Sequence, residues 1–262
     1  MQKILFLSTS RITDAIDALY DLLFLVVQTI RSLPRIPFRT HEIIHQLYDQ
    51  GNRSVTIVLF SITFAGFVVA IEYTYHMRLV LFTAEMVPAF ASVMVFRELA
   101  PALTALLLAT KTGAGMAAEI GSMRVTEQID ALRLLHINPI EYLVVPRLIA
   151  SIITTVSLAL FAVVICLIGI GFVSVTKLQF TIDSFVDQIP MMLSSSDLWM
   201  LIVKAAVFGA VIPIISCYYG LLCKPSAKGV GEATTKAVVV SSILIIALDF
   251  VITSIFSVMA YS

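Results

Sequence analysis

The stretch from Leu148 to Thr176 contains no charged side chain over 29 consecutive residues. As an α-helix it would be about 43 Å long, which exceeds the roughly 30 Å thickness of the hydrocarbon core of a bilayer. The whole chain is 59% hydrophobic and only 13% charged, well outside the usual composition of soluble domains. We therefore predict an all-α integral membrane protein in which this stretch spans the bilayer at a tilt and projects from it at one end.

Four further apolar segments are long enough to cross the membrane. The first is uncharged between Arg53 and Glu72, whereas the second is interrupted by charged side chains. In chain order, the five predicted spans are Ser54–Ile71, Pro88–Ala118, Leu148–Thr176, Ala205–Cys223 and Ala237–Ala260.

The connections between the spans are predicted to differ in character. Glu72–Arg78 is expected to be a polar turn, and the apolar segment that follows from Leu79, which contains Glu85, a re-entrant or interfacial element. Lys177–Asp197 is polar enough to form a loop outside the membrane with a short helix of its own.

Two amphipathic helices are predicted before the first span. Between Ile12 and Ile30, apolar side chains recur at helical spacing opposite three aspartates, the pattern of a helix that lies on a surface. Thr40 is positioned to cap a second helix, which would lie in the interface as an elbow. We accordingly divide the chain into an N-terminal interfacial region, residues 1–52, and a transmembrane domain, residues 53–262.

The distribution of Lys and Arg predicts the orientation of the chain, because cytoplasmic segments of membrane proteins are enriched in these residues. With five spans, twelve basic residues fall on one side: Lys3, Arg11, Arg31, Arg35, Arg39, Arg53, Arg124, Arg133, Arg147, Lys224, Lys228 and Lys236. The other side receives Arg78 and Lys177, with Lys204 predicted near the membrane edge. The N-terminus is therefore expected in the cytoplasm.

A polar, helix-prone segment, Glu119–Arg147, lies on the predicted cytoplasmic side. One helical face would be shared by Val125, Ile129, Leu132 and His136. Asn138-Pro139 is expected to end the helix. The segment is either an ordinary loop helix with solvated charges or a docking helix that fits a groove on a soluble partner, and the pattern favours neither.

Charged side chains inside the predicted spans form a second group of candidates. Arg97 and Glu98 are adjacent, hence about 100° apart around a helix, so they cannot simply neutralise each other along one face. A charge at mid-bilayer costs about 2.5–3.5 kcal/mol and needs a partner or a wet cavity. Either the pair reaches the interface, or it lines a cavity that holds a lipid phosphate, with Arg97 as the partner of the anion. Asp249 is expected to pair with a basic residue of another span or to serve transport.

The sequence offers no catalytic or metal-binding residues. It lacks the H-E-x-x-H and G-x-S-x-G motifs and the phosphate-binding G-x-x-x-x-G-K-[ST] motif, so we expect no cofactor here and any ATP on another chain. Cys166, Cys217 and Cys223 sit in or beside apolar runs without paired spacing, which predicts buried thiols. The 17 basic residues balance the 17 acidic ones, so no net charge favours nucleic acid.

One run identifies a family. RELAPALTALLLATKTGAGMAAEIGSMRVTEQIDALRLLHINPIEYLVVPR, residues 97–147, closely resembles the signature region of the MlaE/YrbE permeases, the membrane subunits of MCE-type ABC lipid transporters. The resemblance extends more loosely to the elbow region and to Gly231–Phe250. Ala100 stands where the family usually has glycine, and Thr110-Lys111 where a glycine-arginine pair is common; Lys111 preserves the cation with a different donor geometry.

The resemblance implies a multi-pass protein of a Gram-negative-type inner membrane that works as a homodimer. It implies a cytoplasmic ABC ATPase on each copy, a periplasmic MCE-domain partner, and phospholipid or a similar hydrophobic molecule moved between inner and outer membranes. Arg97 and Glu98 would bind substrate. The coupling segment, about residues 119–142, would contact the ATPase, and its matching residues are Glu119, Arg124, Glu127, Gln128 and Asp130.

Two other functions remain open at this point. The chain could be an ABC permease for a non-lipid substrate. It could also be a membrane scaffold that recruits a cytoplasmic protein without moving anything.

Overall fold

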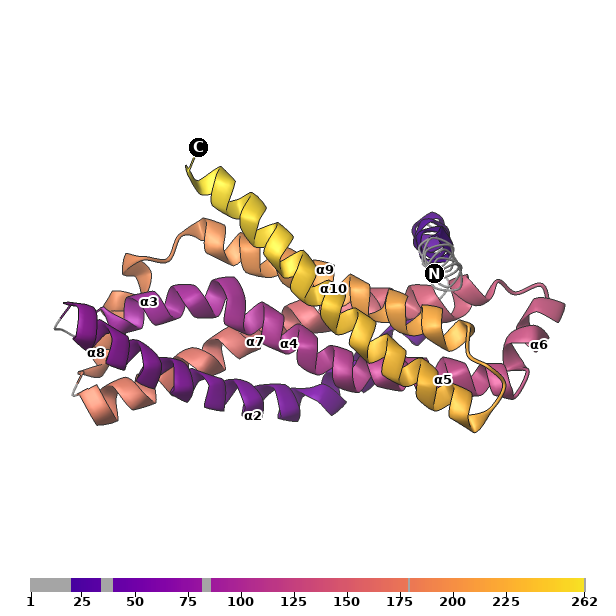
Figure 1. The fold of residues 1–262 in the computed structure, drawn as a ribbon, viewed down its shortest axis with the longest axis horizontal. Helices are drawn as coiled ribbons and strands as arrows, with labels where there is room; N and C mark the ends of the chain where they lie inside the picture. Colours follow the sequence, from indigo (N-terminus) through magenta and orange to yellow (C-terminus); the bar gives the residue numbers. More distant parts are fainter. Residues whose placement is uncertain (1–19, 34–39, 82–85, 179, 262) are drawn as a thin grey trace, which may run out of the picture.

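The computed structural model describes residues 20–33, 40–81, 86–178 and 180–261, and all regular elements in these ranges are helices. The predicted all-α class is therefore confirmed. The long helices run side by side along one axis, with α6 (Gln128–Leu134) at one end of the bundle and α8 (Ile182–Gln188) at the other (Figure 1). We call these the α6 end and the α8 end.

Five helical stretches are long and apolar enough to cross a membrane, as predicted. The first is α2 (Thr40–Leu81), and the last two are α9 (Ser195–Leu221) and α10 (Ala227–Tyr261). The second stretch is built from α3 (Val87–Met94), η2 (Val95–Leu99), α4 (Ala100–Leu108), η3 (Ala109–Gly113) and α5 (Ala114–Val125). The third joins η4 (Ile140–Val144) to α7 (Val145–Leu178). A short turn, η5 (Ile189–Met191), follows α8.

Helix α2 differs from the prediction at both ends. The expected elbow is not a separate helix, because the backbone stays helical from Thr40 through Arg53 into the span. The expected polar turn at Glu72–Arg78 and the start of the re-entrant segment are likewise the last turns of α2. Polar side chains alone suggested these breaks, but the segment contains no proline, and exposed charges do not interrupt a helix. Glu85 lies outside the described residues.

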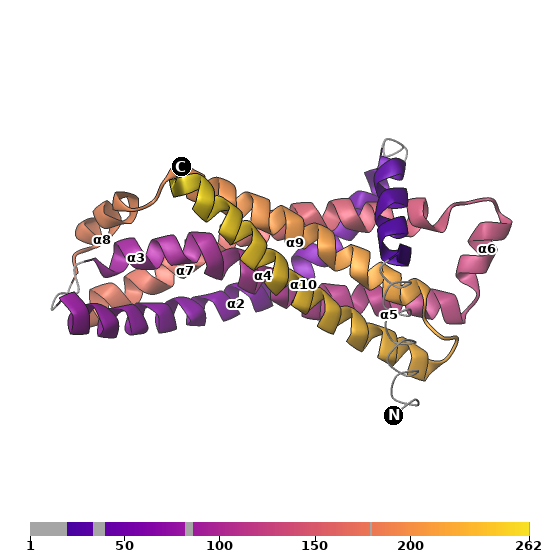
Figure 2. The same cartoon turned by 45° about the horizontal axis from the view of Figure 1, so that its top comes forward.

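A helix at residues 20–32 lies across the long axis of the bundle near the α6 end (Figure 2). It matches the second half of the amphipathic helix predicted from Ile12; residues 12–19 lie outside the described part of the chain. Its exposed large apolar side chains are Tyr20, Leu23, Phe24, Val27 and Ile30. This row is suited to the membrane interface.

Small residues allow the long helices to approach closely. Helix α2 packs along α7, α7 along α9, and α9 along both α5 and α10. A Cβ atom at Gly66 of α2 would lie 2.8 Å from the carbonyl oxygen of Cys166 on α7. Because apolar side chains gain little by leaving lipid for protein, such close backbone contact is a main source of helix association in membranes.

The three cysteines are free and buried, as predicted. Cys166 and Cys217 belong to the apolar interior, and burial raises the pKa of the Cys223 thiol, which lies in the connection after α9. These thiols therefore pack as small apolar side chains.

We predict that Gly66→Ala destabilises the bundle, whereas Gly51→Ala in the same helix does not. At Gly66 the added methyl group meets backbone, and such overpacking costs about 1–3 kcal/mol. At Gly51 no atom lies within 4 Å of the added methyl group, so only the gain in helix propensity, about 0.5–1 kcal/mol, remains. Thermal unfolding in detergent measures the difference, and equal midpoints for the two variants would contradict this packing.

Candidate functional site

A cluster of charged side chains lies inside the bundle, where η2 meets α9 and α10. Its centre is Lys204, whose side chain is fully buried. The Nζ atom lies 2.8 Å from Oε2 of Glu98 and 2.7 Å from Oδ1 of Asp249. The hydroxyl of Thr253 donates to the other oxygen of Glu98 at 3.0 Å. A fully buried cation from one span is therefore held between two partly exposed carboxylates from two other spans that are distant in sequence.

Pro101 explains why the backbone joins this cluster. Proline has no N–H, so Pro101 cannot bond to the carbonyl of Arg97 four residues earlier, as a helix requires. The preceding turn widens into the π-helix η2, and Nζ of Lys204 donates to the free Arg97 carbonyl oxygen at 2.8 Å. π-Turns of this kind are frequent at functional sites.

Arg97 forms the second ion pair of the cluster. Its Nε donates to Oδ1 of Asp197 at 2.6 Å. Asp197 is buried, and its other oxygen accepts the backbone N–H of Ser194 at 2.8 Å, completing a capping box at the start of α9. The side chain of Arg97 nevertheless remains 44% exposed. Among the described residues no partner binds its terminal Nη groups, which leaves two N–H edges able to bind an anion.

The structure therefore brings together both residues predicted to bind substrate, but in different roles. Glu98 is held by Lys204 and Thr253, whereas Arg97 keeps open donors. The predicted pairing of Asp249 with a basic residue of another span is confirmed. Lys204, predicted near the membrane edge, is buried between α9, η2 and α10, and the sequence had not identified it as the partner of Asp249. Asp197, assigned to a loop, was missed as the partner of Arg97.

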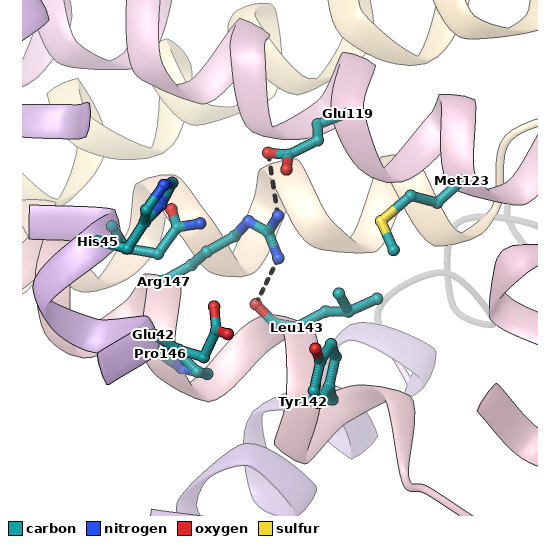
Figure 3. Close-up of a pocket in the computed structure, with 9 residues that line it drawn as sticks. Glu42, His45, Glu119, Met123, Tyr142, Leu143, Pro146 and Arg147 are labelled. Atoms are coloured by element: carbon teal, nitrogen blue, oxygen red, sulfur yellow. Dashed lines mark hydrogen bonds and ion pairs between the residues drawn. The ribbon is translucent and has the colours of Figure 1, made fainter. Parts of the chain in front are cut away.

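A second polar site lies at the α6 end, where α5 meets the start of α7 (Figure 3). Glu119 of α5 binds Nη2 of Arg147 at 2.9 Å, and Nη1 of the arginine donates to the carbonyl oxygen of Leu143 at 2.8 Å. The Arg147 side chain is only 5% exposed. Its cavity of about 180 Å³ is also lined by Glu42 and His45 from the start of α2. Three spans therefore meet at this ion pair.

The predicted coupling segment folds as two short helices rather than one. Helix α5 ends at Val125, and Glu127 adopts a left-handed backbone conformation with φ 58° before α6 begins. Nη1 of Arg124 bridges this turn to Asp130 at 2.9 Å, and Arg133 joins the same carboxylate at 3.3 Å. The turn breaks the continuous face expected from Val125 to His136.

The apolar side of α6 packs on the chain itself. Ile129 is 1% exposed and lies in a small core with Ile120, Leu143 and Cys217. The outer side presents Leu134 and Leu135, which are 82% and 69% exposed. These two leucines form a small exposed apolar surface at the tip of a polar element, and the helical periodicity had not singled them out. Of the predicted coupling residues, Glu127 and Gln128 are exposed beside them. Glu119, Arg124 and Asp130 form ion pairs within the chain.

Known proteins resemble this chain over most of its length. The family description Permease MlaE matches residues 43–255. A probable ABC transporter permease protein of Rickettsia felis is 44% identical over 231 residues, which cover 87% of each chain. A probable ABC transporter permease protein of Synechocystis is 36% identical over 79% of this chain and 78% of its own. The chloroplast protein TRIGALACTOSYLDIACYLGLYCEROL 1 of Arabidopsis thaliana is 35% identical over 81% of this chain and 61% of its own.

We predict that Lys204→Met destabilises the bundle strongly, because it removes the buried cation that the carboxylates of Glu98 and Asp249 share. Breaking a buried pair in this way costs about 3–5 kcal/mol. Adding Glu98→Gln and Asp249→Asn to the variant removes the unpaired charges and should recover most of the loss. Thermal unfolding in detergent is the measurement, and Lys177→Met, at an exposed lysine, is the control. A triple variant no more stable than Lys204→Met alone would contradict the ion-pair explanation.

Proposed function

Because the chain belongs to the MlaE permease family, we propose that it is the membrane subunit of an ATP-driven transporter whose cargo is a phospholipid or a similar hydrophobic molecule. Its relatives are named as probable ABC transporter permeases, and a permease of this class needs an ATPase partner. No nucleotide-binding motif occurs in this sequence, so the ATP is bound by the partner.

The observation that supports a lipid cargo is the guanidinium of Arg97, whose terminal N–H groups remain available inside an apolar bundle. The guanidinium is oriented by Asp197 on one edge and leaves its terminal N–H groups for an anion. A phosphodiester attached to acyl chains matches both this charge and the apolar side chains of the surrounding spans. The name of the Arabidopsis relative contains that of a galactosyl diacylglycerol, which shares the acyl chains but has no phosphate, so the name supports a lipid cargo without specifying the headgroup.

The α6 end is the surface we assign to the ATPase. Leu134 and Leu135 insert into a groove on the partner, and Glu127, Gln128 and Arg133 surround them with polar contacts. The ion pairs of Arg124 with Asp130 and of Glu119 with Arg147 transmit the movement of α6 to the second and third spans. A rigid element docked on a moving partner is a common way to shift packed helices.

The remaining parts of the proposal concern assembly and location. A second copy of the chain packs on the side of the bundle where α10 exposes Ile243, Ile246 and Phe250, so that two Arg97 clusters enclose one cavity. The α6 end faces the cytoplasm of a Gram-negative-type cell, because the predicted excess of Lys and Arg lies there. An MCE-domain partner sits at the α8 end in the periplasm and passes lipid between the inner and outer membranes.

We predict that replacing Arg97 lowers the amount of phospholipid that copurifies with the complex. Arg97→Gln is combined with Asp197→Asn, since a lone Arg97 substitution would strand a buried carboxylate. Loss of one charge-assisted contact, worth about 1.5–3 kcal/mol, should reduce retained phospholipid at least about tenfold at limiting concentration. Mass spectrometry of extracted lipid is the measurement, and Arg78→Gln, at an exposed arginine outside the cluster, is the control.

An unchanged phospholipid content in the Arg97 variant would remove lipid from the proposal and favour a permease for another substrate. A scaffold without transport predicts something different: the Arg97 variant would retain the full ATPase stimulation of the parent. Stimulation is measured on the same purified complexes, so the three functions are separated by one set of samples.

We further predict that Leu134→Glu or Leu135→Glu disrupts ATPase binding without affecting insertion. Both side chains are exposed, so folding does not depend on them, while a buried charge at the centre of an interface should weaken binding about tenfold or more. Copurification of the ABC ATPase from the same genome measures the loss. Leu222→Glu, at another exposed leucine that follows α9 at the same end, serves as control. Copurification that falls equally in all three variants would place the docking surface elsewhere.

A further inference from the structure

A second concave site lies between α2 and the second span, on the α6 side of the Arg97 cluster. Its volume is about 380 Å³, within the range of ligand pockets. The residues that matter for its chemistry are Asp49, Gln50, Arg53, Ser54, Lys111 and Thr112. No role for Lys111 follows from the sequence, and the proposed transport cycle does not use this crevice.

The floor of the crevice is polar although it is buried. Gln50 and Ser54 of α2 are 4% and 1% exposed. The hydroxyl of Ser54 lies 3.2 Å from that of Thr112, which η3 brings toward α2. At Gly115 no atom lies within 4 Å of the position of a Cβ, so the crevice stays open beside these hydroxyls. Buried amide and hydroxyl groups around an open space are the features of a polar ligand site.

The depth of the crevice follows from the charge pattern of the spans. Arg53 directly precedes the uncharged segment Ser54–Ile71, and Arg147 directly precedes Leu148–Thr176. Because Ser54–Ile71 is about as long as the hydrocarbon core is thick, Arg53 marks the level at which that core begins. Lys111 lines the same crevice as Arg53, so its ammonium group lies at this level too. Phospholipid phosphates occupy this level of a bilayer.

The net charge at the rim of the crevice favours an anion with a single negative charge. Arg53 lies 3.6 Å from Asp49, whereas Lys111 forms no ion pair within the described ranges of the chain. Glu119, which also lines the crevice, is held by Arg147. Arg53, Lys111 and Asp49 thus leave one net positive charge, which matches the single negative charge of a phosphodiester. Basic pockets between spans on the cytoplasmic side are known to bind lipid headgroups.

We propose that this crevice binds the phosphate headgroup of a lipid from the leaflet at the α6 end, with Lys111 and Arg53 as the cationic contacts and Gln50, Ser54 and Thr112 as hydrogen-bonding groups. The site is distinct from the Arg97 cluster. Fourteen residues separate Arg97 from Lys111 along one helical stretch, or about 20 Å, which is too far for one headgroup to bridge. The proposal rests on the orientation given under the proposed function but not on lipid being the cargo.

The test uses the full chain in detergent after lipid removal, titrated with dioctanoyl phosphatidylglycerol and followed by native mass spectrometry. Each cation near the membrane surface contributes about 1 kcal/mol to binding an anionic lipid. Arg53→Gln and Lys111→Gln should therefore each weaken binding about fivefold, and the double variant about thirtyfold. Lys177→Gln, which replaces an exposed lysine at the α8 end, should not change the affinity for the lipid. Lys111→Arg keeps the charge and should bind within about twofold of the parent.

Affinity for phosphatidylglycerol that is equal in the parent and the double variant would overturn the proposal. Dioctanoylglycerol, which has the chains but no phosphate, separates headgroup from chain binding: a loss of its binding in the double variant would show that phosphate is not what the cations recognise. Inorganic phosphate tests whether the ligand is a lipid phosphate or free phosphate. If it competes with phosphatidylglycerol at concentrations similar to those of the lipid, the site is assigned to free phosphate instead.

The Arg97→Gln/Asp197→Asn variant distinguishes lipid binding at this crevice from lipid binding at the proposed cargo site. It should retain the binding that depends on Lys111 and Arg53. Loss of that binding in the Arg97 variant would mean that the crevice is not an independent site, whereas loss of copurified lipid in the Arg97 variant alone tests only the cargo.

Discussion

The buried ammonium group of Lys204 determines how the spans of this bundle are arranged. A charge in this position is stable only if oxygens from several directions replace water, and here they come from Glu98, Asp249 and the carbonyl of Arg97. The second, fourth and fifth spans must therefore meet at the same height along the axis of the bundle. Apolar side chains add little to the register of the helices, because they pack almost equally well against lipid tails. The ion pairs thus provide specificity that hydrophobic contact cannot provide.

The same constraint explains the irregular second span. Pro101 removes one backbone hydrogen bond, and the π-turn that results presents the carbonyl of Arg97 to Lys204 and turns Arg97 toward Asp197. A regular helix would satisfy its own carbonyl and leave the lysine with one partner fewer. The irregularity and the buried cation therefore stabilise each other. Because α5 continues this span to Glu119, movement at the α6 end reaches the cluster through a continuous helical stretch.

Much of this could be predicted from the sequence, and the failures have a common cause. The five spans follow from apolar length, and the resemblance of residues 97–147 to one family agrees with the family match. The partners of Lys204 and Asp197 were missed because a charge near the end of an apolar run looks like a membrane boundary, and only the tertiary structure shows that a partner lies opposite. The break at Glu127 was missed because a left-handed glutamate has no sequence signal comparable to glycine. Leu134 and Leu135 were missed because periodicity identifies a buried face, not an exposed tip.

The two cationic sites have different relations to the bundle, and this difference bears on mechanism. Arg97 is held by buried Asp197, so its position changes only if η2 or α9 moves. Arg53 and Lys111 sit at the rim of an open crevice between α2 and η3, where the hydroxyls of Ser54 and Thr112 lie 3.2 Å apart. A lipid bound there would tie α2 to the second span at the level where the Glu119–Arg147 ion pair ties the second span to the third. Occupancy of the crevice would then stiffen the same helices that α6 must move. Lipid in the surrounding leaflet and the ATPase would therefore act on the same group of helices.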